Sequence, residues 1–158
     1  MRRVSAALLG VVLALGGLTL FAAGPASAAP SVAQQSQALH SDVMNVLNGY
    51  VRTYSPELST GDRSRVRALV AKADLALGRL DSAIKEIPRA RSEAAHRAAV
   101  ATALARQVDA KGAATNGMAE VTPLLTAHMN VFELLGAKRD ADRLMARLDE
   151  LGSAIRTA

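Results

Sequence analysis

The 158-residue sequence contains no cysteine and no tryptophan, and its aromatic residues are limited to two tyrosines and two phenylalanines. Without cysteine, disulfides, thiolate metal ligands and cysteine nucleophiles are all excluded. The scarcity of aromatic rings also removes the stacking platforms on which many proteins bind single-stranded nucleic acid. Stability must therefore come from aliphatic packing, and we predict no nucleic-acid-binding role.

Enzyme signatures are absent as well. The sequence has no G-x-S-x-G motif, no H-E-x-x-H motif and no phosphate-binding glycine loop. Its three histidines, His40, His96 and His128, are scattered, and no pair of carboxylates suited to general acid–base chemistry is visible beside them. We predict no catalytic residues and a protein that is not an enzyme.

The N-terminal stretch has the pattern of a secretory signal peptide. Arg2 and Arg3 precede an apolar run over about 4–23, and Ala26-Ser27-Ala28 forms an A-x-A cleavage site. We predict cleavage after Ala28 and a secreted or cell-envelope location, with an uncleaved membrane anchor as the alternative. The excess of arginine over lysine and the abundance of alanine indicate a bacterium with a GC-rich genome.

The charge balance changes when this segment is removed. The whole chain carries a net charge of +5, and Arg2 and Arg3 account for two of those charges, so +3 remains for residues 29–158. That value is low for a dedicated nucleic-acid binder. The remaining 130 residues suit one domain, 29–158, with a core of its own.

The strongest pattern lies between Val66 and Ile87. Apolar residues recur at alternating steps of four and three, which places them on one face of a helix. They are Val66, Val70, Ala73, Leu77, Leu80, Ile84 and Ile87. The period-two alternation of a strand is absent. We predict an all-α fold organised around this segment, which we call the spine.

The remaining segments are read as helices that cover the spine. We predict an antiparallel bundle of four to five helices at about 32–54, 62–87, 89–111, 117–136 and 138–157. Ser31 is the predicted cap of the first helix, and Thr60 or Asp62 that of the second. Pro88 favours a break after the spine, although a single kinked helix over 62–111 is the alternative.

The second half of the chain contains the predicted breaks. Residues 112–117, which begin and end with glycine, are predicted to form a loop. The next helix would start near Gly117 or at Pro123 and would end at Gly136. The helix before this loop would present mainly alanines, at positions 90, 94, 98, 101 and 105, and would therefore bury little area.

His128 is the one candidate cofactor-binding residue. It would lie at the centre of the apolar face of the helix 117–136, between Leu125 and Phe132. It is interpreted either as a neutral core or boundary histidine hydrogen-bonded to a carbonyl or carboxylate, or as a ligand of haem or copper in the bundle core. Methionines are soft partners for such a centre, and Met44, Met118, Met129 and Met145 are the candidates.

Glu93 and His96 have the Glu-x-x-His spacing of di-iron bundles. The other two histidines lack a glutamate three residues earlier, so the pair is interpreted as part of a solvated surface. We also predict the surface ion pairs Glu93–Arg97 and Asp81–Lys85.

Two further groups are conspicuous. Arg139, Arg143 and Arg147 form a row on the last helix, which suits an acidic partner, an anionic membrane surface or a mixed solvated face. Tyr50 and Tyr54 lie one helical turn apart and are expected to pack across one end of the bundle, with haem ligation as the alternative.

These observations predict a fold more firmly than a function. We expect an exported, non-enzymatic binding or interaction module whose partner is a protein or a second copy of itself. The alternative is a haem or metal carrier that uses His128. The expected functional region lies where the spine meets the helix containing Pro123 and His128.

Overall fold

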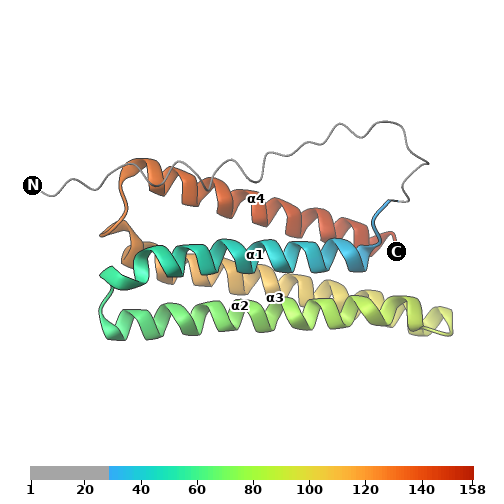
Figure 1. The fold of residues 1–158 in the computed structure, drawn as a ribbon. Coiled ribbons are helices and arrows are strands. Elements are labelled where there is room, and N and C mark those ends of the chain that lie inside the picture. The colour runs from blue at the N-terminus through green and yellow to red at the C-terminus, as the bar shows by residue number, and fades with distance from the viewer. Residues whose placement is uncertain (1–28) are drawn as a thin grey trace, which may run out of the picture.

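The computed structural model describes residues 29–158, which form a bundle of four long helices (Figure 1). The helices are α1 (Val32–Tyr54), α2 (Thr60–Glu86), α3 (Glu93–Thr126) and α4 (Val131–Arg156). Two short 3₁₀ turns, η2 (Ser55–Glu57) and η3 (Ile87–Arg89), follow α1 and α2. No strand occurs in residues 29–158, so the predicted all-α fold is confirmed. The predicted signal peptide, with its cleavage site after Ala28, lies outside the described residues.

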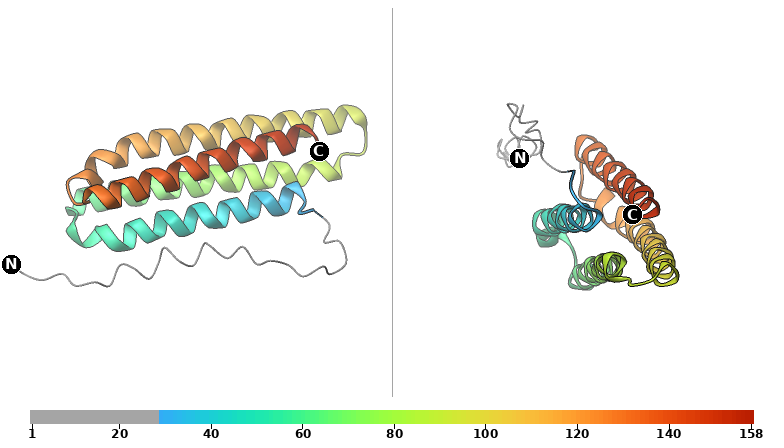
Figure 2. Two further views of the ribbon diagram at one scale, coloured as in Figure 1. Left: turned by 90° about the horizontal axis from the view of Figure 1, so that it is seen from above. Right: turned by 90° about the vertical axis from the view of Figure 1, so that its right-hand side faces the viewer.

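Successive helices run antiparallel, and each contacts the helices on either side of it, so that the end-on view shows a ring of four (Figure 2). The α1–α2 connection and the α3–α4 turn meet at one end of the bundle. The start of α1, the α2–α3 connection and the end of α4 meet at the other (Figure 1). None of the helices in the described part of the chain is long and apolar enough to cross a membrane.

Side-chain caps mark the starts of all four helices, with Ser92 as the cap of α3. Ser31 and Gln34 form a capping box at α1, and Asn130 and Glu133 form another at α4. The predicted Ser31 cap is therefore confirmed. The prediction of Thr60 or Asp62 for α2 is wrong, because the cap is Ser59, whose Oγ accepts a hydrogen bond from the amide of Asp62 at 3.1 Å.

The spine behaves as its spacing predicts. Val66, Leu77, Leu80, Ile84 and Ile87 are buried. The predicted break at Pro88 is also confirmed, since α2 ends at Glu86 and the chain reverses before α3 begins. Proline has no amide proton to donate and its ring clashes with the preceding turn.

The best-packed part of the core lies in the half of the bundle that holds the start of α1 and the end of α4. Its four largest fully buried side chains are those of Leu39, Leu80, Ile84 and Ile155. Ala103 of α3 lies among them with no exposed surface. We call this region the packed half.

The predicted helix boundaries at 89–111, 117–136 and 138–157 are wrong. One helix, α3, runs through Gly112 and Gly117 to Thr126, and α4 runs through Gly136. Glycine inside a helix costs only about 1 kcal/mol relative to alanine, which packing against neighbouring helices can offset. Pro123 lies in the last turn of α3 and starts no helix.

The predicted inward face of α3 is also wrong. Ala94, Ala98, Ala101 and Ala105 are exposed, and Gln107 is buried instead. The Gln107 Nε2 donates a hydrogen bond to the Leu148 carbonyl at 2.9 Å, which satisfies the buried amide. A pattern based on apolar residues alone does not identify an inward-facing glutamine.

Candidate functional site

A cavity of about 490 Å³ lies between the four helices, in the half of the bundle that contains both the α1–α2 connection and the α3–α4 turn. Nearly all of its wall is apolar. Representative wall residues are Val46 and Leu47 of α1, Leu69 and Val70 of α2, and Leu134 and Ala141 of α4. We call this region the hollow half.

The cavity follows from the side chains of α3. The middle of α3 contributes Ala110, Ala113, Ala114 and Gly117 to the wall, and only its last turns add the larger Met118, Val121 and Thr122. The first four residues project at most one methyl group, whereas the facing helices carry valine, leucine and tyrosine. Voids larger than a water molecule are few in protein interiors, so a space of this size is a distinct feature of the fold.

Buried side chains close the cavity at its two ends. Tyr54, Leu58 and Met129 line it beside the connections, and Leu77 and Leu148 line it toward the packed half. Large side chains therefore bound the cavity at both ends, with the alanine-rich stretch of α3 between them.

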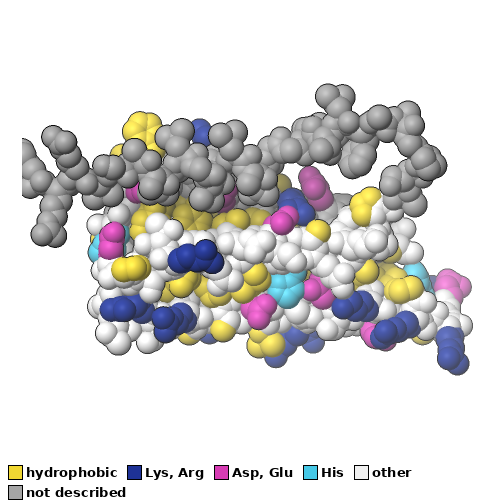
Figure 3. Space-filling model, viewed as in Figure 1, with side chains coloured by type: hydrophobic (Ala, Val, Ile, Leu, Met, Phe, Trp, Pro, Cys, Tyr) yellow, Lys and Arg dark blue, Asp and Glu magenta, His cyan; other side chains and the backbone are white. Residues whose placement is uncertain are grey.

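Three charged residues line the cavity, Arg63, Lys138 and Asp142, and we call them the rim. Arg63 lines the cavity, and its Nε donates to the Leu58 carbonyl at 3.1 Å. Lys138 and Asp142 of α4 form an ion pair at 2.6 Å and are 70% and 66% exposed. The cavity therefore reaches the surface beside α4, and Figure 3 shows hydrophobic side chains along the seam between α4 and α1.

The two tyrosines form part of the wall. Their rings stack with centroids 6.2 Å apart, and the Tyr50 hydroxyl donates to Asp140 Oδ2 at 3.0 Å. Burial, followed by the charge of Asp140, raises the pKa of Tyr50, and burial followed by the charge of Glu133 raises that of Tyr54. The expected packing at this end of the bundle is confirmed, with both phenols held neutral.

His128 does not lie on an apolar helix face, so its predicted placement is wrong. Because α3 ends at Thr126, His128 falls in the turn before α4, is exposed, and lies with Nδ1 3.4 Å from Glu57 Oε2. Phe132, its predicted neighbour, is 86% exposed on α4. Three of the predicted soft partners, Met118, Met129 and Met145, do line the cavity.

The predicted surface groups are partly confirmed. Glu93 and Arg97 pair at 3.5 Å on the exposed face of α3. The predicted Asp81–Lys85 pair is wrong, because Asp81 turns toward α1. In the arginine row, Arg147 pairs with Asp42 of α1, whereas Arg139 and Arg143 are exposed.

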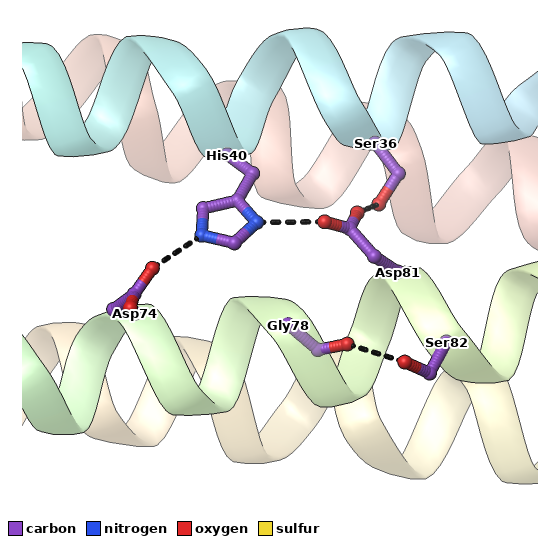
Figure 4. Close-up of polar contacts among 6 residues, drawn as sticks. All are labelled: Ser36, His40, Asp74, Gly78, Asp81 and Ser82. Atoms are coloured by element: carbon purple, nitrogen blue, oxygen red, sulfur yellow. Dashed lines mark hydrogen bonds and ion pairs between the residues drawn. The ribbon is translucent and has the colours of Figure 1, made fainter.

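Asp81 belongs to a polar cluster between α1 and α2 that the sequence analysis missed (Figure 4). His40 contacts Asp81 Oδ2 through Nδ1 at 2.6 Å and Asp74 Oδ1 through Nε2 at 2.8 Å. The Ser36 hydroxyl donates to the other Asp81 oxygen. Ser36 and His40 are four residues apart on α1, and Asp74 and Asp81 are seven residues apart on α2, so each pair lies on one helix face. This spacing is the sequence signal from which the cluster could have been predicted.

The charge state of His40 follows from these contacts. Burial lowers its pKa, but the hydrogen bonds and charges of Asp81 and Asp74 outweigh that effect, and the net result is a raised pKa. The serine bonds to Asp81 and not to the imidazole, so the cluster lacks the serine–histidine contact that activates a nucleophile. It instead joins α1 to α2 electrostatically.

Metal ligation has little support in the described residues. Within 29–158, no group of three or more His, Cys, Asp or Glu side chains has an arrangement that could hold a metal ion. The role of His128 as a cofactor ligand stays a prediction.

Comparisons of the chain with protein-family models, with curated proteins and with solved structures find no significant match.

Proposed function

We propose that this chain is an exported, non-enzymatic binding protein that holds one elongated apolar molecule in the cavity between its four helices. The observation that carries the proposal is the cavity of about 490 Å³, with its aliphatic and aromatic wall. Small-molecule pockets in proteins typically enclose about 300–1,000 Å³ and are predominantly apolar. The export component rests on the signal-peptide pattern of residues 1–28.

The wall favours a ligand with few polar groups. Every hydrogen-bonding group buried with the ligand would need a partner, and the interior supplies almost none. Cavities lined by aliphatic and aromatic side chains stay dry and accept apolar molecules. An acyl chain has the matching shape, because the cavity extends along the helices from Leu58 and Met129 to Leu148.

The rim favours a negative charge at one end of the ligand. Arg63 and Lys138 are cations that line the cavity. Lys138 is largely exposed and pairs with Asp142, the one acidic residue of the described lining, so the lining keeps a net charge of +1. An acyl chain with a carboxylate or phosphate head would bury its chain among the helices and leave its head near these two cations. We therefore propose a fatty-acid-like amphiphile as the ligand class.

The test is a titration of the protein with a fluorescent fatty acid. Ala113→Leu places an isobutyl group in the cavity and is expected to weaken binding at least tenfold. Ala105→Leu makes the same change on the exposed face of the same helix and should bind like the unaltered chain. Absence of saturable binding, or equal affinity in the two variants, would contradict the proposal.

The haem or metal carrier is the second candidate, supported by one observation. Met118, Met129 and Met145 line the cavity, and His128 immediately precedes Met129. A haem titration of the unaltered chain and of His128→Ala tests it. A Soret band at a different wavelength in His128→Ala than in the unaltered chain would favour haem binding through His128. Identical haem spectra of the two proteins would show that His128 is not a haem ligand.

A further inference from the structure

The outer face of the first turns of α4 exposes three large apolar side chains. Phe132 is 86% exposed, Val131 is 69% exposed and Leu135 is 48% exposed. Single exposed apolar residues are ordinary, but three within five residues at the end of a bundle form a patch. Figure 3 shows a hydrophobic group protruding over the start of α4, with a basic side chain beside it.

Two arginines continue this patch along the helix. Positions 132, 135, 139 and 143 are spaced by three or four residues, so Phe132, Leu135, Arg139 and Arg143 share one outward stripe. Both arginines are exposed, and neither forms an ion pair with another of the described residues. The stripe therefore presents an apolar end followed by positive charge.

The acidic residues of the same turns are each engaged by another group, including Asp142, which lies at the edge of the stripe three residues after Arg139. Glu133 accepts the Asn130 amide hydrogen bond in the capping box, Asp140 accepts the Tyr50 hydroxyl, and Asp142 pairs with Lys138. The next acidic residue in line with the stripe is Glu150, about two helical turns beyond Arg143. The charge of this face is therefore locally positive.

We propose that this stripe of α4 docks the protein on an anionic lipid bilayer. Apolar side chains beside arginines are the arrangement by which helices lie in the interfacial region, with the rings among the acyl chains and the cations at the head groups. A second copy of the chain fits less well. A two-fold contact through this stripe would take the arginines of both copies out of water without an acidic partner on the stripe itself.

Docking in this orientation would bring the cavity close to the lipid. Leu134, Ala137 and Ala141 line the cavity from the inner face of the same turns. The rim at Lys138 would then lie within about one helix diameter, 10–12 Å, of the bilayer surface. The docking itself does not depend on what the cavity holds, so it can be tested separately from ligand binding.

The experiment measures co-sedimentation of the full chain, as recovered from an expressing bacterium, with vesicles. One set of vesicles is made of phosphatidylcholine alone, and the other is made of phosphatidylcholine mixed with the anionic lipid phosphatidylglycerol. Every variant has the same N-terminus, checked by mass spectrometry. We expect binding to the anionic vesicles that falls with added salt. Arg139→Gln/Arg143→Gln should reduce the partition coefficient at least tenfold.

The matched control is Arg79→Gln/Arg91→Gln, which removes the same charge from exposed positions on α2 and just before α3. It should bind nearly as well as the unaltered chain. Equal losses in the two double variants would overturn the proposal, because the effect would then follow net charge and not the stripe.

Phe132→Trp introduces a single fluorescent probe on the stripe, since the unaltered chain has no tryptophan. Its fluorescence should shift to shorter wavelength with anionic vesicles, as an indole does on leaving water. Unchanged emission while the protein sediments would overturn docking through α4. A Phe132-dependent dimer in sedimentation velocity, without vesicle binding, would assign the stripe to a second copy instead.

Discussion

The two halves of the bundle are built from the same four helices but differ in how they are filled. In the packed half, Leu39, Leu80 and Ile155 are at most 2% exposed and meet across Ala103. In the hollow half, Ala113 and Gly117 of α3 face valines and leucines across open space. The difference comes mainly from residues 110–117 of α3, whose cavity-lining side chains are too small to reach across.

Polar contacts between helices are also unevenly distributed. The His40 cluster and the Gln107–Leu148 hydrogen bond both lie toward the packed half, as does the Arg147–Asp42 pair. Beside the cavity, Tyr50 bonds to Asp140, and His128 Nδ1 lies 3.4 Å from Glu57 Oε2 between the two connections. The packed half therefore holds most of these polar contacts between helices. The hollow half can remain incompletely filled and accept a ligand.

The largest expected difference comes from truncating one leucine in each half. Leu80→Ala removes a side chain with no exposed surface and should lower the free energy of unfolding by about 3 kcal/mol or more. Leu69→Ala, on the same helix, borders space that is already empty and should cost about 1 kcal/mol. Urea unfolding followed by circular dichroism measures both. Equal losses would show that the halves are packed alike.

Enlarging alanines of α3 should have opposite effects in the two halves. Ala103→Leu overfills a fully buried position and should destabilise the protein by about 1–3 kcal/mol. Ala113→Leu places the same atoms in the cavity and should stabilise it by about 1–2 kcal/mol, because each buried methylene contributes about 0.8 kcal/mol. The midpoints of thermal unfolding should move in opposite directions. A loss at position 113 would contradict an empty cavity.

The polar cluster of the packed half predicts a pH dependence. Since the pKa of His40 is raised above its ordinary value of 6.5, the stabilisation from its protonated form is complete below about pH 6.5 and is lost as the pH rises through the folded-state pKa. His40→Gln should therefore cost roughly 1–2 kcal/mol near pH 6 and less near pH 9. Urea unfolding at the two pH values measures the gap.

His96→Gln is the control for that prediction, because His96 is on α3 and outside the cluster. Its effect should be small at both pH values. If the gap between the unaltered chain and His40→Gln were the same at pH 6 and pH 9, the carboxylates would not be holding the imidazole in its charged form.

Sequence reasoning succeeded where apolar periodicity and proline chemistry act locally. The spine from Val66 to Ile87, the Ser31 cap and the break at Pro88 all follow from such signals. It failed in the second half of the chain, where glycines were interpreted as helix ends. Each glycine penalty is small, and the packing of α3 against its neighbours, which no local pattern reports, outweighs it.

The candidate site was missed for a related reason. The alanine-rich character of the third helix was recognised, but the alanines that matter are 110, 113 and 114, inside or beside the segment read as a loop. A cavity is an absence of atoms between four helices, so it depends on their relative placement. The His40 cluster also needs the register of α1 against α2, which neither helix contains alone.

The smallest expected effect tests whether residues 112–117 are helical or form the loop that the sequence predicted. An added Cβ at Gly117 would meet no atom within 4 Å, so Gly117→Ala should stabilise α3 by about 0.5–1 kcal/mol through helix propensity alone. Gly152 is also helical, but its Cβ would lie 3.0 Å from the buried Gln107 Nε2. Gly152→Ala should therefore destabilise the protein, because moving that amide disturbs its bond to Leu148. Chemical unfolding measures the stability of both variants. A stabilised Gly117→Ala variant requires a continuous α3, whereas a loop at position 117 would leave the stability unchanged or lower it.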